Sequence, residues 1–385
     1  MTEFDGPAAI ALWYGCRDAA LWARADERAN LFAFQPSPWA GLLAQLDPRF
    51  AAVVPSLLIL SDLPDERRDA GPIARAVVSI SEWCEEQSKF GTAAEYAQAA
   101  ALVEPDVPMH AARTARVLKE RAEWKRSASW YDYALYVAKR NGNWEAYADA
   151  YCGLGGLHAE RGNLPHARRL FQRALRVAIR HHVDEQVANA SHYLFTMEAV
   201  AGKWERAEAH VLRALEHYAP ESPRRPRLAR DLAYRWILGG CFDRALPLAQ
   251  EVLKHFSSPA LRALVWSDIA RAAAGAGEDE IFEHAWAQAK VLVDAGAAEP
   301  YRITILLNLA HGAAFRGEVA RAKLPAGHAA DLARHRGEPQ SLLEADALLD
   351  SLHSARRIVP EPVEHRPGDL LDQILRLLQE SGAAA

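Results

Sequence analysis

The densest glycine cluster in this chain, formed by Gly153, Gly155 and Gly156, is the first pattern whose spacing suggests chemistry. Closely spaced glycines let backbone N–H groups approach a phosphate when they lie in a loop before a helix. Here the spacing matches neither GxGxxG nor GxxxxGK[ST], and the flanking residues keep a helical period. We therefore interpret the cluster as a position of close helix packing rather than as a phosphate site.

Histidine side chains give the second candidate, because His181, His182 and His192 are of a type that binds transition metals. No carboxylate or cysteine lies at a ligand spacing from them, so the pattern favours histidines at a helix end or in a polar groove. An H-x-E triplet begins at His158, as in zinc deaminases, but the PCxxC segment of that motif is absent. The sequence therefore predicts no metal site.

Stronger catalytic signatures are also missing from the sequence. It contains no GxSxG nucleophile elbow, no HExxH pair and no EF-hand loop. We therefore predict that the protein is not an enzyme and that it holds no cofactor.

The composition predicts a folded protein with a negative charge balance. Half of the 385 residues are apolar and 25% are charged, which is typical of a packed chain, and the net charge is −5. This balance argues against a general nucleic-acid coat, although a local basic stripe remains compatible with it.

Cysteine usage and the N-terminal residues predict a cytoplasmic location. Cys16, Cys84, Cys152 and Cys241 are scattered singly, which is typical of a reducing compartment. The first 18 residues lack the basic start of a signal peptide, and the apolar segment at 51–60 is too short to span a bilayer. We therefore expect no membrane partner.

The elements that would position any site are repeated. A similar helical pattern occurs seven times, and five copies carry a glycine at one internal position, with successive separations of 40, 38, 37 and 40 residues by subtraction. A period of this size indicates stacked helical units rather than one globular core. The five glycines are Gly162, Gly202, Gly240, Gly277 and Gly317.

The copy at 148–181 resembles a tetratricopeptide repeat, a helix–turn–helix unit of about 34 residues. Small residues at Gly155 and Ala167 would let two helices cross closely, and Gly162 would form the turn between them. The residues that match the repeat are Tyr151, Leu154, Gly155, Ala167, Phe171 and Ala174, whereas His158 replaces the usual Tyr.

The resemblance implies an all-α fold, a right-handed α-solenoid of about seven repeats with helical caps at both ends. Ala122 replaces the turn glycine in the second copy. We expect the residues beyond a 34-residue unit to lengthen the second helices or the loops. The copies lie at 73–106, 108–141, 148–181, 188–221, 226–259, 263–296 and 303–336.

Both ends depart from the repeat. Residues 1–70 predict an N-terminal cap with helices near 8–30, 38–46 and 49–61, and 337–355 predicts a capping helix. Residues 356–385 predict a proline-containing linker and an amphipathic helix at 369–380. This last helix either docks back on the solenoid or binds another subunit, and the solenoid ends could also self-associate.

In this repeat family the first helix of each unit lines a concave groove, so the resemblance also implies a set of ligand-facing positions. The set holds five basic residues and no acid, but an acid, Asp149, occupies an equivalent position in the third copy. Thr304 occupies an equivalent position in the seventh copy. Such a groove would attract carboxylates or phosphates. The predicted groove residues are Arg116, Lys119, Asn189, His192, Thr196, Arg227, Arg230, Tyr234, Ser267, Arg271 and His311.

These observations favour a non-enzymatic scaffold or adaptor that binds a protein or an acidic peptide segment. The alternative is a regulatory sensor module that binds a peptide or small ligand and controls a separate effector protein. Helical-repeat RNA binding is a third class, but the Leu-Gly and Ala-x3-aromatic features favour the protein-binding repeat, so nucleic acid is an unlikely partner. The Lys and Asn pattern of the two-carboxylate clamp in chaperone-binding members is absent.

Overall fold

The computed structural model describes residues 71–86, 89–296, 298–354 and 370–382, and nearly all of them lie in helices joined by short turns. No β-strand occurs among these residues. The predicted N-terminal cap at 1–70 and the predicted linker before the last helix lie outside them. The predicted all-α fold of helical hairpins is confirmed.

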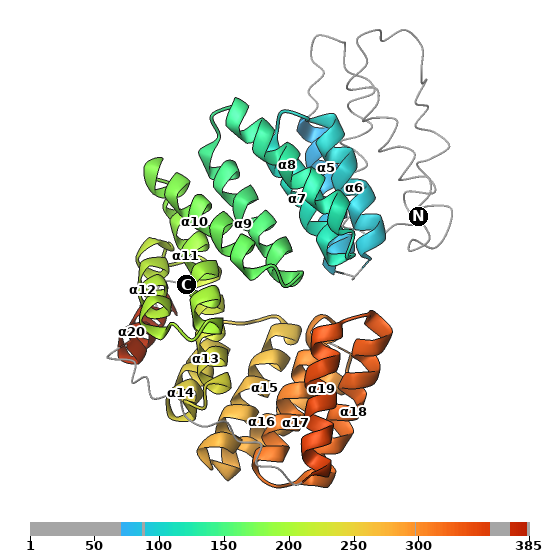
Figure 1. Ribbon diagram of the computed structural model, residues 1–385, viewed down its shortest axis with the longest axis vertical. Coiled ribbons are helices and arrows are strands. Elements are labelled where there is room, and N and C mark those ends of the chain that lie inside the picture. Colours follow the sequence, from blue (N-terminus) through green and yellow to red (C-terminus); the bar gives the residue numbers. More distant parts are fainter. Residues whose placement is uncertain (1–70, 87–88, 297, 355–369, 383–385) are drawn as a thin grey trace. The chain divides into compact units, whose positions relative to one another are not determined.

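The chain divides into two compact units, and the boundary between Leu194 and Phe195 falls inside α11 (Asp184–Val200). In unit 1 the helices pack as successive hairpins, blue to green in Figure 1. Their bounds are α5 Gly71–Glu86, α6 Phe90–Val103, α7 Pro108–Glu120, α8 Trp124–Arg140, α9 Trp144–Glu160 and α10 Leu164–Arg180.

Unit 2 continues the same order of hairpins and ends with two single helices, α19 and α20. A short 3₁₀ helix, η2 (Glu299–Tyr301), precedes α17. The α-helices are α12 Trp204–His217, α13 Arg224–Leu238, α14 Phe242–Leu253, α15 Pro259–Ala276, α16 Asp279–Asp294, α17 Arg302–Phe315, α18 Val319–Arg336, α19 Pro339–His353 and α20 Leu370–Gly382.

Helices that open a hairpin also touch each other from one hairpin to the next. This holds for α7 with α9 in unit 1, and for α13 with α15, α15 with α17 and α17 with α19 in unit 2. We call the odd-numbered helices from α5 to α19 the first helices, and the even-numbered helices from α6 to α18 the second helices. Such contacts between successive hairpins along the chain are typical of a repeat array.

The turns follow the glycine pattern of the sequence. The five predicted turn glycines all have φ between 69° and 80°, in the left-handed region that other residues adopt at a cost. Ala122, with φ of 57°, adopts the same conformation in the copy that lacks the glycine, and His182, with φ of 55°, does so between α10 and α11.

Several helices begin earlier than the predicted copies. α9 begins at Trp144 rather than near residue 148, because the Asn143 side chain accepts a hydrogen bond of 3.0 Å from the Ala146 backbone N–H and caps the helix there. Asn163 caps α10 in the same way. Both helices contain 17 residues, so the added length lies in first and second helices alike.

Small residues allow the predicted close crossing of helices. A Cβ added at Gly155 would lie 2.5 Å from the Phe171 ring, and one added at Gly275 would lie 2.5 Å from the Phe242 ring. Gly153 faces the Tyr131 ring equally closely. Gly153 and Gly155 are therefore explained by the packing of α9 against α8 and α10, whereas a Cβ added at Gly156 would meet no other atom within 4 Å.

The last two helices cover apolar surface of unit 2. α19 packs on α17 and α18, and α20 contacts α14 and α13 of the same unit. Leu370, Ile374 and Leu378, one helical turn apart, are the buried side of α20. The cluster beneath α19 contains Ile303, Leu306, Leu307, Ala329, Ala330, Ala333 and Ala345.

Two kinds of feature are absent from the part of the chain that the structure describes. None of the helices there is both long and apolar enough to cross a bilayer. No group of three or more His, Cys, Asp or Glu side chains there could hold a metal ion.

Candidate functional site

Two of the predicted groove residues, Arg116 and Lys119, lie on α7 in unit 1, and each pairs with an acid on an adjacent first helix. Arg116 Nη1 lies 2.9 Å from Glu85 Oε2 on α5, and Arg113 Nη1 donates to Glu85 Oε1 at 2.8 Å. Lys119 Nζ donates to Glu160 Oε1 on α9 at 2.5 Å. Burial raises the pKa of Glu85, while Arg116 and Arg113 oppose that rise.

The predicted residues of the fourth copy lie on α11. Asn189 is buried, and its Nδ2 donates to Gln186 Oε1 at 3.3 Å. His192 and Thr196 are half-buried on the same helix. These three side chains supply hydrogen-bonding groups on one helix.

In unit 2 a paired charge joins the first helices α13 and α15. Arg230 donates twice to Asp268, from Nε to Oδ2 at 2.7 Å and from Nη2 to Oδ1 at 3.1 Å. Arg230 also lies 3.3 Å from Asp231 Oδ1 and stacks on the Tyr234 ring, with 4.8 Å from guanidinium carbon to ring centroid. Because Asp268 is only 1% exposed, this two-bond pair is an interior contact between repeats.

Asn308 on α17 extends the interaction to the next first helix. Its Nδ2 donates to Asp268 Oδ1 at 2.7 Å and to Ser267 Oγ at 3.1 Å. Its Oδ1 accepts from Arg271 Nη1 at 3.2 Å. All four side chains are buried, so one amide connects two charged groups of α15 to α17.

The row ends at α19. His311 Nε2 lies 3.3 Å from Glu344 Oε1, and Arg271 interacts electrostatically with Tyr234 and Glu344. Arg271 Nε and His311 Nδ1 are buried without a hydrogen-bond partner among the described residues. We call this row the polar ladder, and it consists of Arg230, Tyr234, Ser267, Asp268, Arg271, Asn308, His311 and Glu344.

The charges of the ladder are balanced within it. Burial acts to lower the pKa of Arg230, but the interaction with Asp268 outweighs it and raises that pKa. Burial lowers the pKa of Arg271, and burial together with Arg271 lowers the pKa of His311. The interaction with His311 lowers the pKa of Glu344. Burial raises the pKa of Asp268, while Arg230 and Asn308 oppose that rise. The ladder therefore places two carboxyl groups, Asp268 and Glu344, among its two arginines and favours the neutral form of His311.

The structure corrects the expected charge of this face. The sequence predicts a groove with basic residues and no opposing acid, but Glu85, Glu160 and Asp268 lie against Arg116, Lys119 and Arg230. Arg227 is exposed and has no ion pair among the described residues, and Thr304 is half-buried.

Sequence reasoning missed Asp268, Asn308 and Glu344. A usable signal was nevertheless present, because Arg230 and Asp268 are 38 residues apart and Asp268 and Asn308 are 40 apart. Both separations equal the repeat period, and residues one period apart on first helices lie side by side. The acid could therefore have been sought one repeat away from each base.

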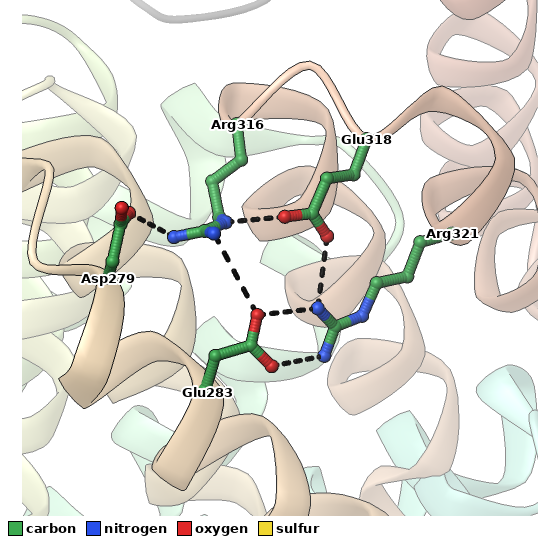
Figure 2. Close-up of polar contacts among 5 residues, drawn as sticks. All are labelled: Asp279, Glu283, Arg316, Glu318 and Arg321. Atoms are coloured by element: carbon green, nitrogen blue, oxygen red, sulfur yellow. Dashed lines mark hydrogen bonds and ion pairs between the residues drawn. The ribbon is translucent and has the colours of Figure 1, made fainter.

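A second polar network, which the sequence did not predict, joins α16 to the start of α18 (Figure 2). Arg321 donates to both carboxylate oxygens of Glu283, at 2.8 and 2.9 Å, and Nη1 also donates to Glu318 at 3.0 Å. Arg316 donates to Glu318 at 2.7 Å and also pairs with Asp279. The Arg321 guanidinium carbon lies 4.1 Å from the Trp286 ring centroid, so the network fastens two adjacent hairpins together.

Comparison with known proteins bears on the fold. No protein-family model and no curated protein matches the sequence. The structure is similar to that of the Rap conjugation gene regulator of plasmid pLS20 in complex with the Phr* peptide. The TM-score is 0.52 at 12% identity, over 94% of this chain and 100% of that chain.

Two further solved structures give lower scores. A Rap protein complexed with competence and sporulation factor has a TM-score of 0.48 at 11% identity, over 91% of this chain and 99% of that chain. PilF of Pseudomonas aeruginosa has a TM-score of 0.41 at 16% identity, over 60% of this chain and 96% of that chain. The conjugation gene regulator, whose TM-score is above 0.5, is a tetratricopeptide-repeat protein, so the predicted resemblance to that repeat is confirmed at the level of the fold.

Proposed function

We propose that this protein is a regulatory module that binds a peptide segment at the first helices of unit 2 and controls a separate effector protein. The observation that carries the proposal is the likeness to a conjugation gene regulator in complex with a peptide, over 94% of this chain. A likeness of that extent includes most of the hairpins and not one isolated repeat.

The polar ladder supports the position of the site. Tyr234 and His311 are partly exposed, and Arg271 Nε and His311 Nδ1 lack partners within the described residues. A peptide backbone offers both carbonyl acceptors and N–H donors, so the partly exposed Tyr234 side chain suits a directional hydrogen bond. The partnerless nitrogen atoms of Arg271 and His311 are buried, so a peptide would reach them only when neighbouring first helices shift. Because the ladder balances its own charges, an acidic residue of the peptide would pair with the exposed Arg227 instead.

A regulatory module differs from a passive adaptor in its response to a bound peptide. Neighbours of this fold are mostly non-catalytic, which supports a function through binding alone. In the proposed function the occupied ladder alters the packing of neighbouring first helices, since the contacts of Asp268, Asn308 and Glu344 each join two repeats. A passive adaptor would hold its ligand with the helices unchanged.

The test uses a displayed library of random 12-residue peptides selected on the full chain. We expect enriched peptides whose affinity, measured by fluorescence anisotropy, falls about fivefold in Tyr234→Phe and in His311→Gln, as expected for one lost hydrogen bond. Tyr136→Phe is the matched control, because Tyr136 is 61% exposed on unit 1. Circular dichroism checks that helicity is retained.

Three results would contradict this function. If the selection enriches no peptide, or if both variants bind the enriched peptide as tightly as the parent chain, the ladder is not the peptide site. If small-angle scattering is unchanged at saturating peptide, the protein is an adaptor and the regulatory part of the proposal is wrong.

A further inference from the structure

The outward side of α10 carries a line of arginines. Arg169, Arg173, Arg176 and Arg180 are spaced by four, three and four residues, which places them on one side of a helix. With a rise of about 1.5 Å per residue the line is about 16 Å long. All four are exposed and lie opposite the buried residues of α10. We call these four residues the arginine stripe.

No described carboxylate pairs with the arginine stripe. α10 contains no acidic residue between Leu164 and Arg180. Arg169 Nη2 lies 3.2 Å from His166 Nδ1, and Arg173 stacks on the Tyr151 ring, with 4.8 Å from guanidinium carbon to centroid. Neither contact neutralises a guanidinium charge.

Several basic residues on α7 and α8 differ from the stripe because they have acidic partners, whereas Lys125 and Lys139 on α8 have none among the described residues. Arg116 and Lys119 on α7 have acidic partners on adjacent helices, and on α8 Arg126 pairs with Glu123 and Arg140 with Asp106. Like charges one turn apart destabilise a helix, so an unpaired stripe costs stability in the isolated chain. An acidic surface brought from outside would remove that cost.

We propose that the arginine stripe is a docking surface for an acidic helix of a partner protein. A helix with Glu or Asp at the same four-three-four spacing has the same distances along its axis between carboxylates as α10 has between the four guanidinium groups. Arg suits this role because its planar fork can make two hydrogen bonds to one carboxylate. The chain as a whole has a net charge of −5, so a locally basic stripe would orient such a partner toward this side.

A nucleic-acid strand fits the stripe less well. Binding of single strands relies on aromatic side chains on which bases stack, and the residues that alternate with the arginines on the exposed part of α10 include no aromatic ring. The exposed apolar residue beside the stripe is Ile179, at 50% exposure, which suits the aliphatic edge of an amphipathic helix.

This surface lies in unit 1 and is separate from the proposed peptide site, so each can fail without the other. In the proposed function it would be the contact with the effector. Tyr234→Phe and His311→Gln, which test the polar ladder, should therefore leave the binding of an acidic helix to the arginine stripe unchanged.

The experiment measures binding of the full chain to a 21-residue alanine-rich helical peptide with four Glu at four-three-four spacing. The stripe variant is Arg169→Glu/Arg176→Glu/Arg180→Glu, which keeps Arg173 on Tyr151. The matched control, Lys290→Glu/Lys323→Glu/Arg334→Glu, makes the same charge change on second helices of unit 2. A peptide with Gln in place of Glu and a 20-nucleotide oligo-dT complete the set.

We expect the Glu peptide to bind the parent chain about tenfold or more tightly than the Gln peptide, and added salt to weaken this binding. The stripe variant should bind the Glu and Gln peptides with equal affinity. The matched control and Tyr234→Phe should still prefer the Glu peptide. Circular dichroism checks that the stripe variant is folded.

Three outcomes would overturn the proposal. In the first, the Gln peptide binds as well as the Glu peptide. In the second, the folded stripe variant binds the Glu peptide like the parent chain. In the third, oligo-dT binds more tightly than the Glu peptide and depends on the same arginines, which would assign the stripe to nucleic acid.

Discussion

At the scale of single residues, the side chains on the first helices are set by partners one repeat away. Arg230 is oriented by two hydrogen bonds to Asp268, and Arg271 by one to Asn308. A buried charge without such a partner would be strongly unfavourable, so each arginine requires a polar group on the adjacent helix. Arg271 Nε still lacks a hydrogen-bond partner among the described residues, and it is buried.

Backbone conformation at single turn residues gives a direct prediction. Ala122 has φ of 57°, where five other copies use glycine, so Ala122→Gly should stabilise the protein by about 0.5–1 kcal/mol. The relief of the left-handed conformation outweighs the greater freedom of glycine in the unfolded chain. The midpoint of urea denaturation followed by circular dichroism measures the change.

The control for this prediction is Ala347→Gly, at an exposed position inside α19. This substitution should lower stability by about 0.5–1 kcal/mol, because glycine disfavours a helix interior. If Ala122→Gly also lowers the midpoint, the left-handed alanine is not a source of strain.

At the scale of helices, the sequence was sufficient to predict where the turns lie. It was insufficient to predict where each helix begins and which side chains pair between helices. The five glycines located the turns because the left-handed conformation has few alternatives. The start of α9 was missed because it depends on the Asn143 side chain, which the repeat pattern does not include. Asp268 was missed because the sequence analysis considered the basic residues at the groove positions and not the acids that pair with them on the adjacent first helix.

The attachment of α20 is a property of a whole helix and can be tested as such. Ile374 is fully buried on the side of α20 that faces α14 and α13, so Ile374→Asp places a charge in an apolar contact. Three buried aliphatic side chains contribute about 1.5–3 kcal/mol each before the loss of conformational freedom is subtracted. We therefore expect the substitution to release α20 and leave the hairpins folded.

Hydrogen exchange measures this release residue by residue. Amides of α20 should lose protection in Ile374→Asp, while amides of α15 to α18 should keep it. Gln373→Asp is the matched control, because that side chain is exposed on the same helix. Continued protection of α20 in Ile374→Asp would show that its docking does not depend on this contact.

At the scale of the molecule, the two units share one construction and differ in how their polar groups are buried. Unit 1 pairs its charges in half-exposed contacts such as Arg116 with Glu85, and carries the unpaired arginine stripe. Unit 2 buries Arg230, Asp268 and Asn308 and closes with two covering helices. The proposed docking surface and the proposed peptide site therefore lie in different units.

The pH dependence of stability combines one histidine from each unit. Burial lowers the pKa of His158, and burial together with Arg271 lowers the pKa of His311, so the folded chain binds protons less readily there than the unfolded chain. Stability then rises with pH where the unfolded histidine titrates, and it is lost as pH falls from about 7.5 to about 5.5. As the pH falls across this interval, the midpoint of urea denaturation should fall, and His158→Gln/His311→Gln should flatten the plot of midpoint against pH.

His353→Gln, at an exposed histidine, is the control that should leave the slope of that plot unchanged. A midpoint that rises on acidification would mean that the carboxyls with raised pKa values, Glu85 and Asp268, dominate over both histidines.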